Sequence, residues 1–177
     1  MKKLLFTAAI AVLGFASVNA QEEATTNGPT SKGKIFIEAN TGNAVLGTTG
    51  IYFSSTDGES TYNIGLDGGY FIMDDLAVKA GFGYGDGTSD FDSSVVSYRI
   101  GAKYYVKSMI PVTVDLTGSS FEDADENPLW LGIGAGYAWF VSDNISIEPG
   151  LRYNLSLNED YTDEGVLQFN VGFALHF

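Results

Sequence analysis

The chain has 177 residues, with 22 Asp and Glu against nine Lys and Arg, and its formal net charge of −13 excludes a nucleic-acid partner, because phosphate binding needs clustered cations. It contains no Cys, which excludes disulfides, thiolate metal sites, a thiol nucleophile and a lipidated cysteine. The length suggests one domain, and 22 Gly with 14% aromatic residues are typical of strands and turns.

The first twenty residues have the pattern of a secretory signal peptide. Lys2 and Lys3 precede an apolar run over residues 4–15, and small residues lead to an expected cleavage site after Ala20. The apolar run is too short to cross about 30 Å of hydrocarbon, which argues against a membrane anchor. Residues 21–32 are polar, so we expect a flexible tail before a domain over residues 33–177.

From residue 33 onward, apolar residues alternate with small or polar ones, the period-two pattern of strands with two different faces. In the last strand Leu167 and Leu175 lie on one face, with Gln168 and Asn170 on the other. Pro149 lacks an amide hydrogen, so we expect a bulge or break in its strand. The eight expected strands cover residues 33–42, 61–72, 76–86, 94–107, 110–116, 129–141, 145–157 and 166–177.

Short and long connections alternate between these strands. Tight turns are expected near residues 73–75, 108–109 and 142–144, and long loops over residues 43–60, 87–93, 118–128 and 158–165. Within the first long loop, residues 51–53 are suited to extend a strand beyond the membrane. An up-and-down antiparallel barrel has all its short turns at one end and its long loops at the other. The sequence therefore predicts an all-β fold built from four β-hairpins.

Alternation alone does not show which face points inward, and a soluble lipocalin-like barrel would have its apolar face inside. Three features favour a barrel whose apolar residues face outward. The other face is rich in glycine, which makes room for side chains in a narrow lumen. The apolar face is uncharged, and its aromatic residues gather at two levels. The expected aromatic girdles are Tyr62, Tyr84, Tyr98, Tyr153 and Phe169 toward the long loops, and Tyr70, Tyr104, Trp139 and Phe177 toward the short turns. We therefore predict an eight-stranded antiparallel up-and-down transmembrane β-barrel.

The signal peptide, the eight strands and the aromatic last strand together resemble the small outer-membrane β-barrels of the OmpA and OmpX type. Residues 145–153, Pro149 included, resemble the penultimate strand of that porin-like family. The resemblance implies a bacterial outer-membrane location, outer-membrane lipid as surroundings, a monomer, and recognition of the last strand by the barrel-assembly machinery. The residues that match this assembly signal are Phe169, Val171, Phe173, Leu175 and Phe177.

Charged residues also occur on the inward face, in a balanced set of four acids and four bases. Charges in a narrow lumen are unfavourable unless they are paired, so we expect an ion-pair network that fills the barrel. The alternative is that these groups line a hydrated pore separately. The residues of the expected network are Glu38, Asp67, Lys79, Arg99, Lys103, Asp115, Glu148 and Arg152.

The long-loop end is acidic, and no Lys or Arg occurs in those connections. Oxygen clusters suit Ca²⁺ or Mg²⁺, but neither residues 86–92 nor residues 122–126 have EF-hand spacing, and solvated loops explain the charge as well. No other cofactor is expected. The acidic residues at this end are Asp57, Glu59, Asp86, Asp90, Asp92, Glu122, Asp123, Asp125, Glu126, Glu159, Asp160, Asp163 and Glu164.

Catalytic machinery is not evident in the sequence. The only histidine is His176, which is predicted to point inward beside the short turns, and no serine triad or phosphate-binding glycine motif accompanies it. We therefore expect no enzyme, but an integral outer-membrane barrel with a structural or surface-interaction role and acidic extracellular loops. The alternatives are a narrow porin-like channel or small-solute transporter, and a soluble lipocalin-like ligand-binding barrel.

Overall fold

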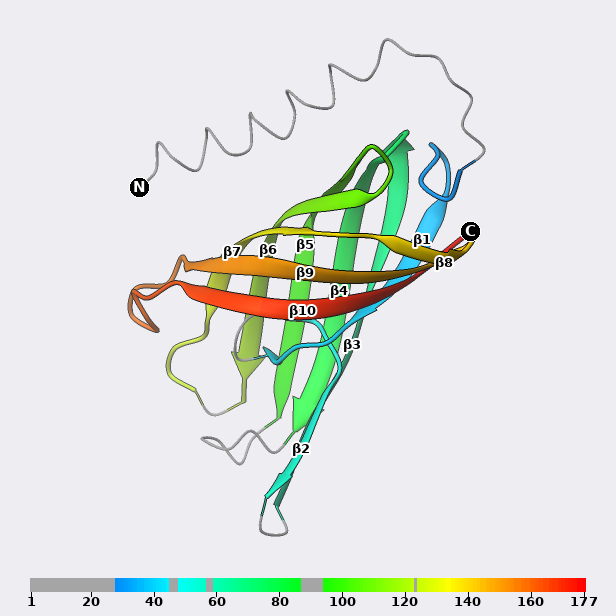
Figure 1. The fold of residues 1–177 in the computed structure, drawn as a ribbon. Coiled ribbons are helices and arrows are strands. Elements are labelled where there is room, and N and C mark those ends of the chain that lie inside the picture. Colours follow the sequence, from blue (N-terminus) through cyan, green and yellow to red (C-terminus); the bar gives the residue numbers. More distant parts are fainter. Residues whose placement is uncertain (1–27, 45–47, 57–58, 87–93, 123) are drawn as a thin grey trace.

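The computed structural model describes residues 28–44, 48–56, 59–86, 94–122 and 124–177. Ten strands form one antiparallel sheet (Figure 1). They are β1 Ile35–Asn40, β2 Tyr52–Thr56, β3 Glu59–Met73, β4 Leu76–Asp86, β5 Val95–Val106, β6 Ile110–Phe121, β7 Leu129–Gly136, β8 Trp139–Ser142, β9 Ile145–Ser156 and β10 Val166–His176. Within these described ranges, no helix is long and apolar enough to cross a membrane.

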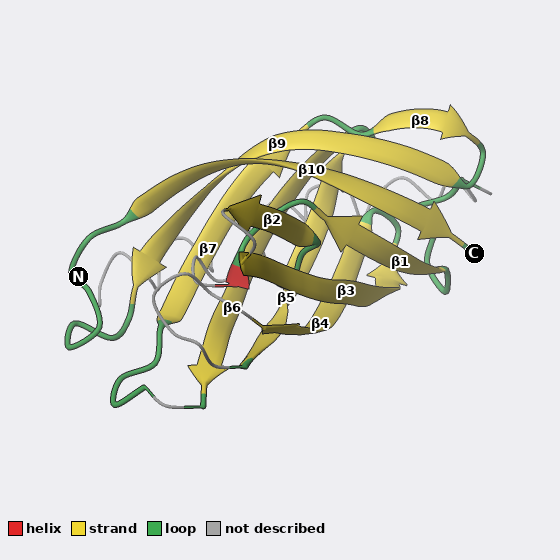
Figure 2. Ribbon diagram, turned by 90° about the horizontal axis from the view of Figure 1, so that it is seen from below, coloured by secondary structure: helices red, strands yellow, loops and turns green. Residues whose placement is uncertain are grey.

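The sheet closes on itself because β1 pairs with both β10 and β3. β8 continues the line of β7 along β9, and β2 pairs along β3 beyond the end of β1. The ten strands therefore make eight columns, and Figure 2 shows them wrapped around one interior. The prediction of an eight-stranded antiparallel up-and-down barrel is confirmed.

Apolar side chains lie on the outside of this barrel and charged ones lie inside. Leu167 and Phe169 are 66% and 69% exposed, whereas Asp67 and Lys103 are 1% and 2% exposed. Lipid surrounds a barrel with this inverted distribution. The soluble lipocalin-like alternative is wrong, because it needs its apolar face inside.

The fifth predicted strand is longer than expected. β6 runs on to Phe121 instead of ending at Leu116, and it takes up residues assigned to the acidic loop. Gly118 lies in this extension, opposite Tyr98 of β5, and a Cβ on it would lie 2.4 Å from the Tyr98 ring. The Tyr98 ring thus covers Gly118. This contact joins two strands, so the alternation within one strand could not predict it.

Pro149 does not interrupt its own strand β9, but the neighbouring strand is interrupted opposite it, between β7 and β8. β9 continues through Pro149, which lies opposite Val171 of β10. On the other side Tyr137 donates its amide hydrogen to the Pro149 carbonyl (3.0 Å), and Pro149 has no amide hydrogen to return. The amide of Ala138 points to the other side, where it donates to the Met109 carbonyl (2.7 Å) in the register of β6 and β7. The break expected in the strand of Pro149 therefore falls opposite it, between β7 and β8.

Of residues 43–60, predicted as an external loop, residues 43–44 and 48–50 form an inward insertion, residues 52–56 form strand β2 and residues 59–60 begin β3. After Thr41 the chain turns into the barrel, where Thr49 is fully buried. It returns to the wall at Ile51, whose amide donates to the Asn40 carbonyl (2.6 Å). β2 then pairs along β3, so the expected strand extension is present.

Residues 28–32 lie against the short turns. The Thr30 hydroxyl donates to the Asp75 carboxylate (2.6 Å), and the Thr30 carbonyl accepts the Asp75 amide (2.8 Å). The Lys32 amide donates to the Asp74 carboxylate (2.7 Å). These bonds hold the described part of the expected flexible tail against the barrel. The rest of that tail and the predicted signal peptide lie outside the described residues.

Candidate functional site in the barrel lumen

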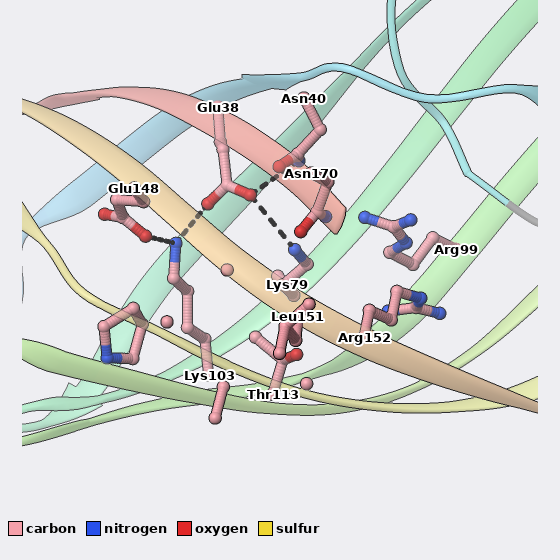
Figure 3. A pocket seen from close by; sticks show the side chains of 15 residues that line it. Glu38, Asn40, Lys79, Arg99, Lys103, Thr113, Glu148, Leu151, Arg152 and Asn170 are labelled. Atoms are coloured by element: carbon pink, nitrogen blue, oxygen red, sulfur yellow. Dashed lines mark hydrogen bonds and ion pairs between the residues drawn. The ribbon is translucent and has the colours of Figure 1, made fainter. Parts of the chain in front are cut away.

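Eight charged side chains meet in the middle of the lumen and form a chain in which acids and bases alternate. Figure 3 shows the part of this chain from Glu148 to Lys79. Neighbours in the chain lie within ion-pair distance, for example 2.6 Å between Lys103 and Glu148 and 2.7 Å between Arg99 and Asp67. The order is Glu148, Lys103, Glu38, Lys79, Asp67, Arg99, Asp115 and Arg152.

These are the eight residues that the inward alternation selected, and the structure brings all of them together. They come from six strands, because β5 contributes Arg99 and Lys103, β9 contributes Glu148 and Arg152, and β1, β3, β4 and β6 contribute one each. None of the eight is more than 7% exposed. Four negative and four positive groups at such burial make the lumen electrically balanced, as desolvation requires.

The pair between Asp115 and Arg152 has the best geometry. Arg152 Nη1 and Nη2 donate to the two carboxylate oxygens of Asp115 at 2.7 and 2.6 Å. Thr117 donates to Asp115 (2.8 Å) and accepts from Arg152 (3.0 Å), and Arg152 Nε donates to Asn154 (2.6 Å). Such a two-point contact, in which each guanidinium nitrogen also donates at least one hydrogen bond, is the strongest type of buried ion pair.

Lumen glycines provide the space for these long side chains. A Cβ at Gly132 would lie 1.8 Å from Nη2 of Arg152, and a Cβ at Gly101 would lie 2.2 Å from Cβ of Asp115. Real atoms cannot approach so closely. The glycine-rich inward face therefore has the packing role that the sequence suggested.

Neutral side chains complete the network and were not assigned to it from the sequence. The Tyr105 hydroxyl donates to Glu148 (2.8 Å), and the Asn40 amide donates to Glu38 (2.6 Å). Each lies two residues from a charged member on the same inward face. This two-residue spacing could have identified both side chains from the sequence, because inward polar residues beside buried charges are expected to hydrogen-bond to them.

An aromatic cluster closes the short-turn end. Phe36, Phe71 and Tyr105 are at most 1% exposed, and Phe140 packs against them. Ring centroids lie 5.7 Å apart for Phe36 and Phe71 and 5.4 Å apart for Phe140 and His176. No residue of this cluster except His176 was singled out from the sequence.

His176 is held inside that cluster. Its Nδ1 lies 3.2 Å from the Pro29 carbonyl and its Nε2 lies 3.2 Å from the Ser146 hydroxyl. Ser146 also donates to Glu148 (2.7 Å). His176 and Ser146 are 1% and 0% exposed. This contact offers no access for a substrate, so it does not have the geometry of a serine nucleophile with its base.

The inward insertion closes the long-loop end. The Thr49 hydroxyl donates to Asp67, which ties the insertion to the charged chain. Ser119 donates to the Ala44 carbonyl (2.5 Å), and Thr48 donates to Gln168 (3.4 Å). Sequence reasoning missed this insertion, because a polar segment rich in Gly and Thr is also typical of an exposed loop.

Little space remains between the two closures. The central cavity has a volume of about 50 Å³. Glu38, Lys79, Arg99 and Asn170 are among the residues that line it (Figure 3). This volume holds a few water molecules.

The aromatic side chains expected at the membrane interfaces lie on the outside with one exception. Tyr104 is 5% exposed, and its cross-strand neighbour Leu76 is 6% exposed. The two side chains therefore lie in a covered part of the barrel wall. The others, exposed by 37–69%, are Tyr62, Tyr70, Tyr84, Tyr98, Trp139, Tyr153, Phe169 and Phe177.

The described acidic loop residues form separate contacts. Glu122 accepts a hydrogen bond from Ser94 (2.9 Å), and Glu126 accepts one from Asn158 (3.2 Å). In the part of the chain that the structure describes, no group of three or more His, Asp or Glu is arranged to hold a metal ion. Asp57, Asp90, Asp92 and Asp123 lie outside that part.

The fold, the apolar exterior and the charged interior define a class, the small transmembrane β-barrels of outer-membrane type. The N-terminal β-barrel domain of Pseudomonas aeruginosa OprF has a similar structure, with a TM-score of 0.51 and 17% identity over 82% of this chain and 98% of that one. Neisserial surface protein A gives a TM-score of 0.45 at 16% identity, covering 81% of this chain and 96% of that one. Yersinia pestis Ail gives 0.46 at 15% identity, covering 83% and 99%. No protein-family model and no curated protein matches the sequence.

Proposed function

We propose that this protein is an integral protein of the bacterial outer membrane whose closed barrel anchors acidic loops at the cell surface. The observation that carries this proposal is the filled lumen. The aromatic cluster closes one end, the charged chain occupies the middle, and the inward insertion closes the other end. An ion would have to displace paired buried charges to pass.

The apolar exterior supports the membrane location. Ile64, Phe82 and Ile100, which are 61–64% exposed, lie on three consecutive strands and would aggregate in water but suit lipid. With the predicted signal peptide, this surface favours the outer membrane, with the short turns in the periplasm and the long loops outside. A monomer fits a barrel whose lumen is complete within one chain.

The last strand is proposed as the element that the barrel-assembly machinery recognises. Phe169, Phe173 and Leu175 of β10 and Phe177 directly after it point outward and are 45–69% exposed. Removal of Phe177 should lower the amount of inserted protein more than it changes the folded barrel. Equal outer-membrane amounts of the truncated and complete chains would contradict this role.

Planar-bilayer recording tests the closed barrel against the porin-like alternative. The folded protein should give no stable ohmic steps, and heat-modifiable migration on SDS gels should show that the sample is folded. A matched pair of variants sharpens the test. Phe71→Ala opens the aromatic cluster, whereas Leu175→Ala changes only the exterior, and neither should conduct while the charged chain and the insertion remain. Stable steps from the unmodified protein would defeat the proposal.

A further inference from the structure

His176 lies where the last strand meets the N-terminal strap, a name used here for residues 28–32. Figure 1 shows the C-terminal end of β10 beside β1 and β8. The Nδ1 atom of His176 lies 3.2 Å from the Pro29 carbonyl oxygen of the strap, and its Nε2 atom lies 3.2 Å from the Ser146 hydroxyl of β9. The imidazole ring therefore connects the strap to the interior of the barrel.

The Ser146 hydroxyl continues this connection to the charged chain. Ser146 donates to Oε1 of Glu148 (2.7 Å), which also accepts from the Tyr105 hydroxyl (2.8 Å). The other carboxylate oxygen of Glu148 lies 2.6 Å from Nζ of Lys103. An ionised carboxylate only accepts hydrogen bonds, so the hydrogen between Ser146 and Glu148 must come from Ser146.

These contacts determine where hydrogens are needed on the imidazole ring. A hydroxyl has one hydrogen, so Ser146 cannot donate to Glu148 and to His176 at the same time. The contact between Ser146 and Nε2 is then a hydrogen bond only if Nε2 carries the hydrogen. A carbonyl oxygen only accepts, so the contact with Pro29 needs a hydrogen on Nδ1. Both contacts are complete only when His176 is the doubly protonated imidazolium.

A neutral His176 has a single ring hydrogen and must leave one contact without any. The hydrogen bond from Ser146 to ionised Glu148 is strengthened by the charge, so Ser146 keeps this bond and Nε2 must supply the hydrogen that faces Ser146. The lone pair of Nδ1 then faces the carbonyl oxygen of Pro29. Pro29 is also the partner that can move, because it belongs to the strap, whereas Ser146 is part of a barrel strand.

The surroundings of His176 contain several groups that attract a positive charge. The rings of Phe140 and Phe36 have their centroids 5.4 and 5.9 Å from that of His176, and aromatic rings attract cations. Two acids and one base act on the ring from inside the barrel, and one of each borders it outside, while loss of hydration opposes the charge. The charged and titratable groups are Glu38 of β1, Lys103 and Tyr105 of β5, Glu148 of β9, and outside them Lys34 before β1 and Asp143 before β9.

The strap has separate anchors on its two sides. From Thr30 onward it is held by hydrogen bonds to the turn between β3 and β4, where Thr30 and Lys32 meet Asp75 and Asp74. Pro29 is held by His176, and both residues border the same hollow at the short-turn end. Displacement of Pro29 would therefore bring water to the imidazole ring.

We propose that His176 is a pH-sensitive latch, whose protonation fastens the N-terminal strap over the aromatic cluster and whose deprotonation loosens it. Protonation favours the docked strap, so the docked strap favours protonation to the same extent. The additional docking is therefore present below the transition of His176 and is lost as pH rises through it. Histidine changes its charge between about pH 5 and 8. This response to acidity goes beyond the anchoring function proposed above.

NMR on the chain from residue 21 onward, folded in detergent micelles and without an affinity tag, tests the latch. The chain has one histidine, so its two imidazole nitrogens report protonation and tautomer directly. At about pH 8 the neutral ring should carry its hydrogen on Nε2, and at about pH 5 both nitrogens should be protonated. The second measurement is the protection of strap amides from hydrogen exchange.

The two informative amides are those of Lys32 and of residue 75, which donate to Asp74 and to the Thr30 carbonyl. Their protection factors should rise about fivefold from about pH 8 to about pH 5, the effect of one hydrogen bond, with the same midpoint as His176. The experiment is made in the Asp75→Asn background, because Asp75 is the other titratable group that binds the strap.

Two serine variants on the same strand separate the latch from general effects of pH. Ser146→Ala removes the competition for one hydrogen, so neutral His176 should carry its hydrogen on Nδ1 and hold Pro29 at either pH. The pH dependence of strap protection should then be lost. Ser156→Ala is the matched control, because its hydroxyl bonds to the Asn158 carbonyl at the other end of β9 and the pH dependence should remain.

Three results would overturn the latch. The first is a His176 that keeps one protonation state from about pH 8 to about pH 5. The second is strap protection that stays constant while His176 titrates. The third is the same pH dependence in Ser146→Ala as in Ser156→Ala. If Ser146→Ala does not fold, the first two results still decide, since they are obtained with Ser146 in place.

Discussion

Acidic residues occur in two regions of this molecule under opposite conditions. In the lumen Glu38, Asp67, Asp115 and Glu148 are buried and joined to four bases. At the long-loop end the acidic residues have no Lys or Arg in the same connections. The remaining bases after residue 20, Lys32, Lys34 and Lys107, lie at or before the short turns.

The difference shows that burial, and not overall composition, decides where charges must be balanced. Two opposite charges attract far more strongly in a dry interior than in water, but removing each from water is unfavourable. A buried acid therefore needs a partner in good geometry, whereas a loop acid is stabilised by water. The same type of substitution should then have very different effects in the two regions.

The largest effect is expected for Asp115→Ala, which leaves the Arg152 guanidinium buried without its two-point partner. The free energy of unfolding should fall by about 3–5 kcal/mol. Urea titration of the folded barrel in detergent measures it. In the double variant with Arg152→Ala the loss should be smaller than the sum of the two single losses. A loss below about 1 kcal/mol for Asp115→Ala would mean that water reaches this pair.

A smaller effect is expected for Gly132→Ala, which places a methyl group where the Arg152 guanidinium lies. Overpacking of this kind should lower the free energy of unfolding by about 1–3 kcal/mol. Gly68→Ala is the matched control, because a Cβ there meets no atom within 4 Å. The same urea titration compares them, and equal stabilities of the two variants would show that the arginine moves aside freely.

Asp75 is less buried than the lumen acids and less exposed than the loop acids, and it should make the stability of the protein depend on pH. Burial raises the pKa of Asp75, and nearby Asp74 adds to this, although Thr30 and Ser108 donate hydrogen bonds that oppose it. The folded state therefore binds the proton of Asp75 more tightly, so the stability that Asp75 contributes is highest at low pH and falls as pH rises through its raised pKa.

Asp75→Asn should remove this dependence. Its φ of 63° suits Asn as well as Asp, so the backbone conformation is kept. The variant should match the original protein near pH 3 and be more stable at pH 7. Unfolding midpoints measured across this range check it, and a difference that is constant with pH would argue against a titrating Asp75.

The smallest effect is expected for Glu164→Gln in the loop before β10. The side chain is exposed, so the free energy of unfolding should change by less than about 0.5 kcal/mol. The urea titration used for Asp115→Ala gives the direct comparison. A loss as large as that of the buried acid would show that the loop charges are structurally paired.

Period-two alternation predicted the strands, and the glycine-rich opposite face, the uncharged apolar face and the two levels of aromatic residues then predicted the barrel and its inward set of charges. The reason is local: Glu38, Lys79 or Arg152 must point inward if their apolar neighbours face lipid. The order of the ion pairs could not be predicted in the same way. It depends on the stagger between strands, which brings Arg152 of β9 to Asp115 of β6 across the intervening β7.

The local sequence also gave a wrong prediction where the chain leaves the barrel wall after Thr41. Thr48 and Thr49 have the composition of an exposed loop, and only their contacts with Gln168 and Asp67 show that the segment lies inside the barrel. The same applies to the break opposite Pro149, which falls on another strand. Alternation within each strand thus separated the residues into two faces, and the glycine and aromatic residues indicated which face meets lipid and which faces the lumen. Pairing between distant strands decided how the lumen closes, because those contacts join residues far apart in the chain.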